Sequence, residues 1–348
     1  MQTPEKATGT VADASRGNWL DRYAPEWLKP YGRLARWDRP LPLLLLFWPC
    51  GFALALAALA EPARGFDWWA LVLFYIGSVA MRGAGCTFND IVDTDIDMKV
   101  ARTRSRPIPS GQVTKRQAAL FLVLQSLVGL VVLLQFNATT VMLGVASLVL
   151  VAIYPFMKRV TWWPQLFLGL AFNWGALIGW SSQTGSLALP PLLLYVGGIL
   201  WTIGYDTIYA LQDIEDDALV GVKSTARLFG RRARLLVALF YAATVVLWVA
   251  AGLMVGAGWL FLVGMLSVIG ILGWQVRTLE PHDPPDPPRE ERAGVGMPLA
   301  VVVEEHRHRR GIDPRQQRAL GIMVVVGRGV ARRAPHHVGG MPAELDPA

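Results

Sequence analysis

Residues 89–97 read NDIVDTDID and directly follow an apolar segment long enough to cross a bilayer. On a helix, Asn89 or Asp90 lies on the same face as Asp93 and Asp97, because these positions recur at helical spacing. Carboxylates along one face repel one another unless a cation lies among them. Oxygen ligands favour a hard cation such as Mg²⁺, which keeps waters and substrate phosphates in its shell. The stretch therefore predicts a site for a metal-bound phosphate compound.

A second acidic stretch lies much later in the chain, at residues 205–217. Asp213 and Asp217 are neighbours at i, i+4, and Asp206 lies about two turns earlier on roughly the same face. Two acidic faces at the ends of two membrane helices would meet across one cavity. A pair of metal ions that clamps a diphosphate is the simplest chemistry that uses both faces.

The composition excludes an ordinary soluble protein. The chain has 348 residues, of which 53% are hydrophobic, and its mean hydropathy is +0.38. These values are typical of a protein that crosses the bilayer several times. The net charge of +7 does not indicate a nucleic-acid partner, because the cations lie in short loops between apolar segments. Cys50 and Cys86 lie in or beside apolar segments without metal-ligand spacing, so we expect two small buried residues.

Eight apolar segments follow one another, and most approach the length of a membrane-spanning helix. Lys and Arg concentrate in alternate connections, so the positive-inside rule places those connections, the N-terminus and both acidic stretches in the cytoplasm. The sequence therefore predicts an all-α polytopic transmembrane helical bundle. The eight predicted spans are Leu41–Ala60, Trp68–Phe88, Gln117–Gln135, Thr139–Tyr154, Trp163–Ser181, Pro190–Leu211, Arg234–Met254 and Ala257–Gln275.

The two ends of the chain differ from this membrane domain, which we place at residues 40–275. Residues 1–39 predict a cytoplasmic segment along the membrane surface, since its aromatic residues alternate with basic ones; a disordered tail is the alternative. No targeting segment is visible, which favours a bacterial inner membrane over the alternative, a mitochondrial inner membrane. Residues 276–348 form an atypical polar tail without aromatic residues. Two explanations stay open for it: a disordered tail, or a shifted reading frame.

Both acidic stretches resemble the two signatures of the UbiA superfamily of intramembrane prenyltransferases, and the resemblance extends from about Leu34 to Gln275. A basic stretch between them is similar to the 4-hydroxybenzoate branch of that family. The residues that carry the resemblance are Met81–Asp90, Arg102–Thr103 and Arg106–Gly111 for the first signature, Tyr205–Ala210, Asp213, Asp217 and Gly221–Thr225 for the second, and Tyr154–Arg159 with Trp163–Gln165 for the branch.

The resemblance implies nine transmembrane helices around a central cavity, with Mg²⁺, a polyprenyl diphosphate donor and 4-hydroxybenzoate as acceptor. It implies prenylation of the ring carbon ortho to the hydroxyl, with release of diphosphate, in ubiquinone biosynthesis. Another aromatic or quinone precursor is the alternative acceptor. The ninth helix should lie where the polar tail stands in this chain.

We assign site roles on this basis. Asp90, Asp93, Asp206, Asp213 and Asp217 are the expected catalytic acids. Those expected to hold metal are Asn89, Asp90, Asp93, Asp97, Asp213 and Asp217. We expect Arg102, Arg106 and Lys223 to bind the diphosphate, and Arg159, Lys158 or Arg36 to bind the acceptor carboxylate.

Other features of the sequence favour structural roles or a different function. Asp95, Glu215 and Asp216 lie off the inward faces, which predicts solvated side chains. Gly83 and Gly85 do not follow a strand, so they predict close helix packing rather than a dinucleotide loop. A cation-coupled transporter would also carry acids in the membrane, but the neighbouring Lys and Arg residues would repel a transported cation.

Overall fold

A computed structural model describes residues 18–98, 103–214 and 223–280. This part of the chain is helical and contains no strand. The helices are α1 Trp19–Tyr23, α2 Lys29–Leu34, α3 Pro40–Ala60, α4 Trp68–Val92, α5 Thr94–Asp97, α6 Lys115–Leu133, α7 Ala138–Val160, α8 Pro164–Asn173, α9 Gly175–Thr184, α10 Leu189–Ala210, α12 Thr225–Phe229, α13 Ala233–Met254 and α14 Trp259–Thr278, with short 3₁₀ turns at Pro62–Arg64, Leu211–Asp213 and Gly230–Arg232.

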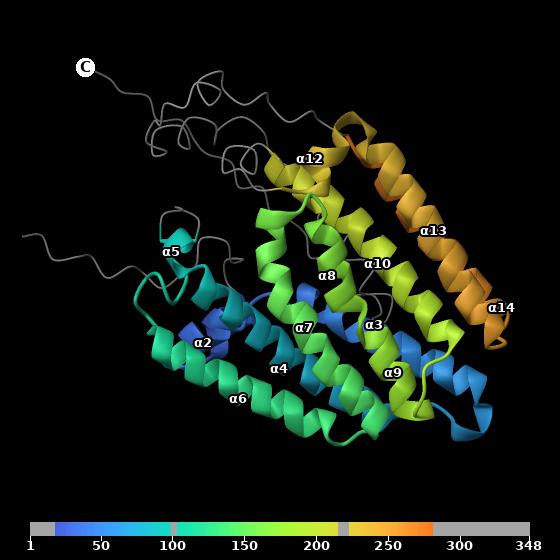
Figure 1. Ribbon diagram of the computed structural model, residues 1–348, viewed down its shortest axis with the longest axis horizontal. Helices are drawn as coiled ribbons and strands as arrows, with labels where there is room; N and C mark the ends of the chain where they lie inside the picture. Colours follow the sequence, from blue (N-terminus) through green and yellow to red (C-terminus); the bar gives the residue numbers. More distant parts are fainter. Residues whose placement is uncertain (1–17, 99–102, 215–222, 281–348) are drawn as a thin grey trace, which may run out of the picture.

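The long helices lie side by side, and the ends of α4 and α10 that carry the acidic stretches lie at the same end of the bundle, near α5 and α12 (Figure 1). Within the described residues, seven helices are long and apolar enough to cross a membrane. The predicted all-α polytopic membrane bundle is therefore confirmed. The polar tail from residue 281 onward, including both explanations offered for it, lies outside the described residues.

The fifth predicted span was wrong as a single helix, because the chain forms two helices of 10 residues each, α8 and α9, that meet at Trp174. The Trp174 indole donates to the backbone oxygen of Leu143 on α7, at 2.9 Å. Beyond it, α9 lies directly on α3: a Cβ added at Gly179 would come within 2.5 Å of the backbone oxygen of Cys50. Contact with two neighbouring helices thus accompanies the break, and the periodicity of the segment carried no sign of it.

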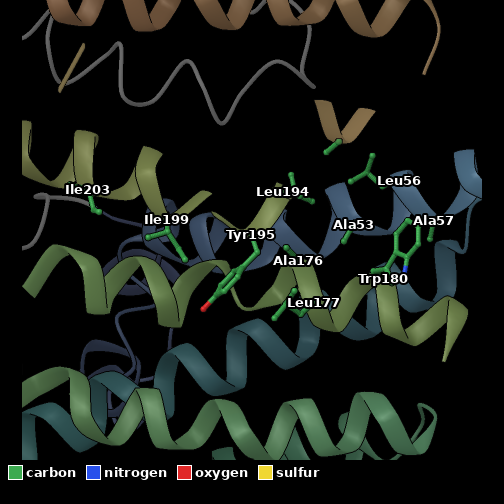
Figure 2. Packing of buried hydrophobic residues seen from close by; sticks show 11 residues of the cluster. Ala53, Leu56, Ala57, Ala176, Leu177, Trp180, Leu194, Tyr195, Ile199 and Ile203 are labelled. Carbon is green, nitrogen blue, oxygen red and sulfur yellow. The ribbon is translucent and has the colours of Figure 1, made fainter. Parts of the chain in front are cut away.

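Small residues let the central helices approach closely. Figure 2 shows Trp180 of α9 beside Ala57 of α3, in a buried cluster that continues along α10 to Ile199 and Ile203. Between membrane helices, such association depends on close van der Waals packing, because lipid is as apolar as the side chains. The backbones of α3 and α9 can therefore approach only where side chains are absent or small.

Replacing Gly179 by alanine should lower the free energy of unfolding by about 1–3 kcal/mol, because the added methyl group meets backbone rather than a movable side chain. Gly270→Ala on α14 is the matched control, since nothing lies within 4 Å of its added Cβ. That change should be neutral or stabilising by up to about 1 kcal/mol. Thermal unfolding in detergent measures both, and equal melting temperatures for the two variants would contradict the close α3–α9 contact.

Two local predictions also need correction. The stretch from Pro155 was expected to be a loop, but α7 continues through it to Val160 with Pro155 inside the helix. Proline removes one backbone donor without forcing the helix to end when packing holds both sides. On α10, the helix ends at Ala210 and tightens into a 3₁₀ turn at Leu211–Asp213, so the helix expected to carry the second acidic face stops before Asp213.

A cavity of ≈ 370 Å³ lies between α4 and α6, and its lining includes Trp37, Tyr75, Phe121 and Gln125. No residue of either acidic stretch lines it. The central cavity expected between the two acidic stretches thus stays a prediction.

Candidate active site

The first acidic stretch lies where α4 ends. Asp93 caps the helix, and its backbone N–H donates to the Asn89 backbone oxygen at 2.9 Å. The Asp97 N–H donates to the Asp93 oxygen at 2.9 Å. Because these two bonds join residues four positions apart, the backbone keeps its helical path from α4 into α5. Asn89, Asp93 and Asp97 therefore share a face. Asp93 and Asp97 are both buried.

Asp90 lies off that face and is fully buried. Its carboxylate accepts from Nη2 of Arg36 at 2.9 and 3.1 Å, and from Nη1 of Arg106 at 3.3 Å. The same Arg106 nitrogen donates to Oδ2 of Asp97 at 2.8 Å. The cation required among these acids is thus an arginine supplied by the loop after α5.

Arg36 has an unusual backbone. Its φ of 59° makes it the one non-glycine residue with positive φ in the described ranges. This conformation costs a non-glycine residue about 1–3 kcal/mol, and it persists only where the surroundings enforce it. Here its side chain donates to the backbone oxygen of Arg33 at 3.0 Å as well as to Asp90.

A cation and an aromatic ring meet between α4 and α8. The Arg82 guanidinium of α4 lies 5.5 Å from the ring centre of Phe172 on α8, and its buried Nε has no hydrogen-bond partner. These two helices therefore bring a cation and an aromatic ring together within the membrane region.

Several predicted site residues are not tested by the structure. Arg102 and Asp217 lie outside the described residues, and the side chains of Lys158, Arg159 and Asp213 are likewise not described. Lys223 donates from Nζ to the backbone oxygen of Val160 at the end of α7, at 3.2 Å.

The donor set fits a hard cation only in part. Among the described residues, no three His, Cys, Asp or Glu groups come together as a metal site would require. The face of Asn89, Asp93 and Asp97 offers one amide and two carboxylates, which are ligands suited to Mg²⁺. The described residues thus offer part of the predicted ligand set, and the prediction requires Asp213 and Asp217 to complete it.

The predictions for Asp95, the two glycines and the two cysteines have different outcomes. Asp95 is exposed, as expected for a solvated acid, and lies 3.7 Å from Lys115. Gly83 packs closely, since a Cβ there would fall 1.8 Å from Oε1 of Gln125 on α6, whereas Gly85 has open space and its predicted packing role was wrong. Of the two cysteines, Cys50 is buried and Cys86 only partly so.

Sequence reasoning missed Phe172 beside Arg82. An arginine two turns before an acidic motif was the one available signal for this contact. Phe172 on α8 carries no such mark, so its place beside Arg82 depends on helix packing.

Comparison with known proteins gives a consistent picture. A sequence profile described as the UbiA prenyltransferase family matches residues 46–293. Three relatives are named 4-hydroxybenzoate polyprenyltransferase, mitochondrial. The Arabidopsis thaliana protein is 47% identical over 79% of this chain and 67% of its own length. The Drosophila melanogaster protein is 52% identical over 64% and 57%, and the human protein 45% identical over 76% and 71%. This chain thus spans little more than half of the fly protein.

Solved structures share the fold. A UbiA homolog from Aeropyrum pernix K1 aligns with a TM-score of 0.57 and 28% identity, over 67% of this chain and 87% of that one. A UbiA homolog from Archaeoglobus fulgidus, bound to GPP and Mg²⁺, aligns with a TM-score of 0.60 over 85% and 97%, at 16% identity. At that identity the second likeness concerns the fold alone.

Proposed function

The chain belongs to the UbiA prenyltransferase family, and on that premise we propose that it transfers a polyprenyl group from polyprenyl diphosphate to the ring carbon ortho to the hydroxyl of 4-hydroxybenzoate. Diphosphate is released, and the product would serve ubiquinone biosynthesis. The observation that carries the proposal is the face of Asn89, Asp93 and Asp97 at a membrane-helix end, whose two carboxylates are buried, in a chain that shares about half of its aligned residues with enzymes of that name. Another aromatic or quinone precursor is the alternative acceptor.

We assign binding of the diphosphate to the first acidic stretch and its neighbouring arginines. When the allylic C–O bond breaks, negative charge grows on the leaving oxygens, and cationic side chains held nearby lower the barrier. We assign this role to Arg106, which the structure holds at the acidic face, and to Arg102 and Lys223. Asn89, Asp93 and Asp97, with Asp213 and Asp217, would hold Mg²⁺, which neutralises diphosphate charge when bound.

We assign the aromatic acceptor to the group around Arg82. A guanidinium binds a carboxylate through two parallel hydrogen bonds, and the buried Nε of Arg82 has its donor available. Phe172 offers an aromatic wall that would help to exclude the water able to quench a prenyl cation. Asp206 on α10 would help to orient Arg82. Arg36, one of the acceptor ligands predicted from the sequence, is already bound to Asp90.

The protein is an integral membrane protein. Of the two membranes that the sequence left open, we propose the mitochondrial inner membrane, because the relatives' names place them in mitochondria. The bacterial inner membrane, expected first, has no support from those relatives. Detection of an epitope-tagged chain in fractionated membranes would test this.

The central test is incorporation of labelled 4-hydroxybenzoate into a lipid-extractable product by membranes that contain the full chain and a polyprenyl diphosphate. Product should form with Mg²⁺, disappear with EDTA and return when excess Mg²⁺ is added, because the acids alone cannot neutralise the leaving group. Product that forms equally well in EDTA would contradict the metal assignment. Product with a different aromatic acceptor and none with 4-hydroxybenzoate would establish the alternative.

A further inference from the structure

We infer that Asp90 is a positioning residue rather than a metal ligand: Arg36, presented by the folded N-terminal segment, holds Asp90, and Asp90 aims Arg106 at the diphosphate. The N-terminal segment here means residues 18–39. The inference rests on the prenyl transfer proposed above and adds to it the residues that position its cation.

Asp90 is poorly placed to bind metal. It is fully buried, and its two oxygens accept three hydrogen bonds from two guanidinium groups, at 2.9, 3.1 and 3.3 Å. Such charge-assisted bonds are strong, and breaking them would leave charges buried without partners. By contrast, Asn89, Asp93 and Asp97 lie together on the neighbouring face of the helix.

Arg106 connects Asp90 with that face. Its Nη1 lies between Oδ1 of Asp90 and Oδ2 of Asp97, at 3.3 and 2.8 Å. Its side chain keeps 16% of its surface exposed. The loop that carries it is tied back to the acidic stretch, because the Thr103 hydroxyl donates to the Asp97 backbone oxygen at 3.0 Å. Asp90 therefore helps to fix where the Arg106 guanidinium lies.

The N-terminal segment packs against the loop that carries Arg106. Leu34 is fully buried against Ile108, Val113 and Ala118, which follow Arg106 in the chain. Arg33 also bonds across this contact, to Gln112 at 3.4 Å.

Contacts within the N-terminal segment also hold the backbone on both sides of Arg36. Arg33 pairs with Asp21 at 2.8 Å, and the Trp19 indole donates to the Trp37 backbone oxygen at 2.8 Å. Packing on both sides thus maintains the positive φ of Arg36 and the direction of its side chain. The N-terminal segment thus presents the Arg36 guanidinium to Asp90.

Loss of Arg36 should act through Asp90. Without its main partner, Asp90 would draw Arg106 toward itself and leave more negative charge beside the acidic face. Residues that support a metal or phosphate site from behind typically change its affinity or activity by about 10- to 100-fold. We therefore expect the KM for polyprenyl diphosphate to rise by about 10- to 100-fold, with a smaller change in kcat.

The test compares Arg36→Asn, Asp90→Asn and the double variant in the full chain. Asparagine tolerates positive φ, so Arg36→Asn removes the guanidinium and leaves the backbone free to keep its path. Arg33→Asn is the matched control, because Arg33 lies in the same segment but its bonds go to Asp21 and Gln112. KM and kcat are measured for the donor, Mn²⁺ binding with inorganic diphosphate is followed by electron paramagnetic resonance, and thermal unfolding reports folding.

If the pair acts as one unit, the double variant is no worse than the worse single variant, Arg36→Lys recovers part of the loss, and Mn²⁺ still binds to Asp90→Asn. Independent, additive losses would overturn the inference, as would loss of Mn²⁺ binding in Asp90→Asn alone, which would make Asp90 a ligand. An Arg33→Asn loss equal to that of Arg36→Asn would show that folding of the segment is responsible. Should the wild-type chain lack prenyl transfer, the proposed function fails, and the binding of Mn²⁺ and diphosphate still decides the role of Asp90.

Discussion

Replacing Asp93 by asparagine should lower the rate of prenyl transfer by about 10²- to 10³-fold, the loss typical when one preorganised group that stabilises transition-state charge is removed. Asp93 is buried on the face that it shares with Asn89 and Asp97, at the point where α4 ends. Asparagine keeps the shape of the side chain and its backbone N–H bond to Asn89, so the change removes charge with little effect on the helix end.

Asp95→Asn provides the control for Asp93. The two residues are two positions apart, but the Asp95 side chain is 81% exposed and faces Lys115 across 3.7 Å. Its loss should change the rate by no more than about twofold, as for an exposed ion pair. Initial rates with 4-hydroxybenzoate and saturating donor measure both variants. Equal losses would mean that the total negative charge of this stretch matters rather than the inward face.

The second large effect is expected at Arg82. Arg82→Gln should weaken binding of 4-hydroxybenzoate by about 10- to 150-fold, because hydrogen bonds to a charged group contribute about 1.5–3 kcal/mol. The guanidinium lies over Phe172 at 5.5 Å, and its Nε is buried without a hydrogen-bond partner. The loss should therefore appear in the KM for the acceptor and leave the KM for the donor nearly unchanged.

A neutral acceptor separates recognition of the carboxylate from other effects. Methyl 4-hydroxybenzoate lacks the negative charge, so the Arg82→Gln variant should lose most of the preference for the acid over this ester. Arg64→Gln, an exposed arginine in the turn between α3 and α4, should keep the wild-type preference. If Arg82→Gln lowers activity with acid and ester by the same factor, Arg82 supports the fold or the donor site instead.

Local properties of the chain were sufficient for much of this molecule. The apolar segments predicted eight membrane-spanning helices, because a membrane helix must satisfy its own backbone and needs about twenty apolar residues to do so. Seven helices of the described residues are long and apolar enough to span, and the segment predicted as the fifth span forms α8 and α9 instead. Helical spacing also predicted that Asn89, Asp93 and Asp97 share a face, and the backbone bonds of the α4 end support it. Each of these properties depends on the residues of one segment alone, so it can be predicted without knowing which other segments that segment contacts.

Contacts between distant segments were decided only by the tertiary structure. The break at Trp174 goes with close contact to α3 and a bond to α7, and Arg36 reaches Asp90 across 54 positions of sequence. Spacing on one helix says which residues face inward, but it does not say which residue of another helix they meet. The role proposed for Asp90 differs for that reason from the expected one, because this acid is held by arginines from two loops. Arg82 lies beside the ring of Phe172 on another helix, which its own segment did not indicate. The sequence by itself thus determined the bundle and its inward acids, while packing decided the partner of each buried charge, since a charge in the membrane is stable only beside the groups that folding brings to it.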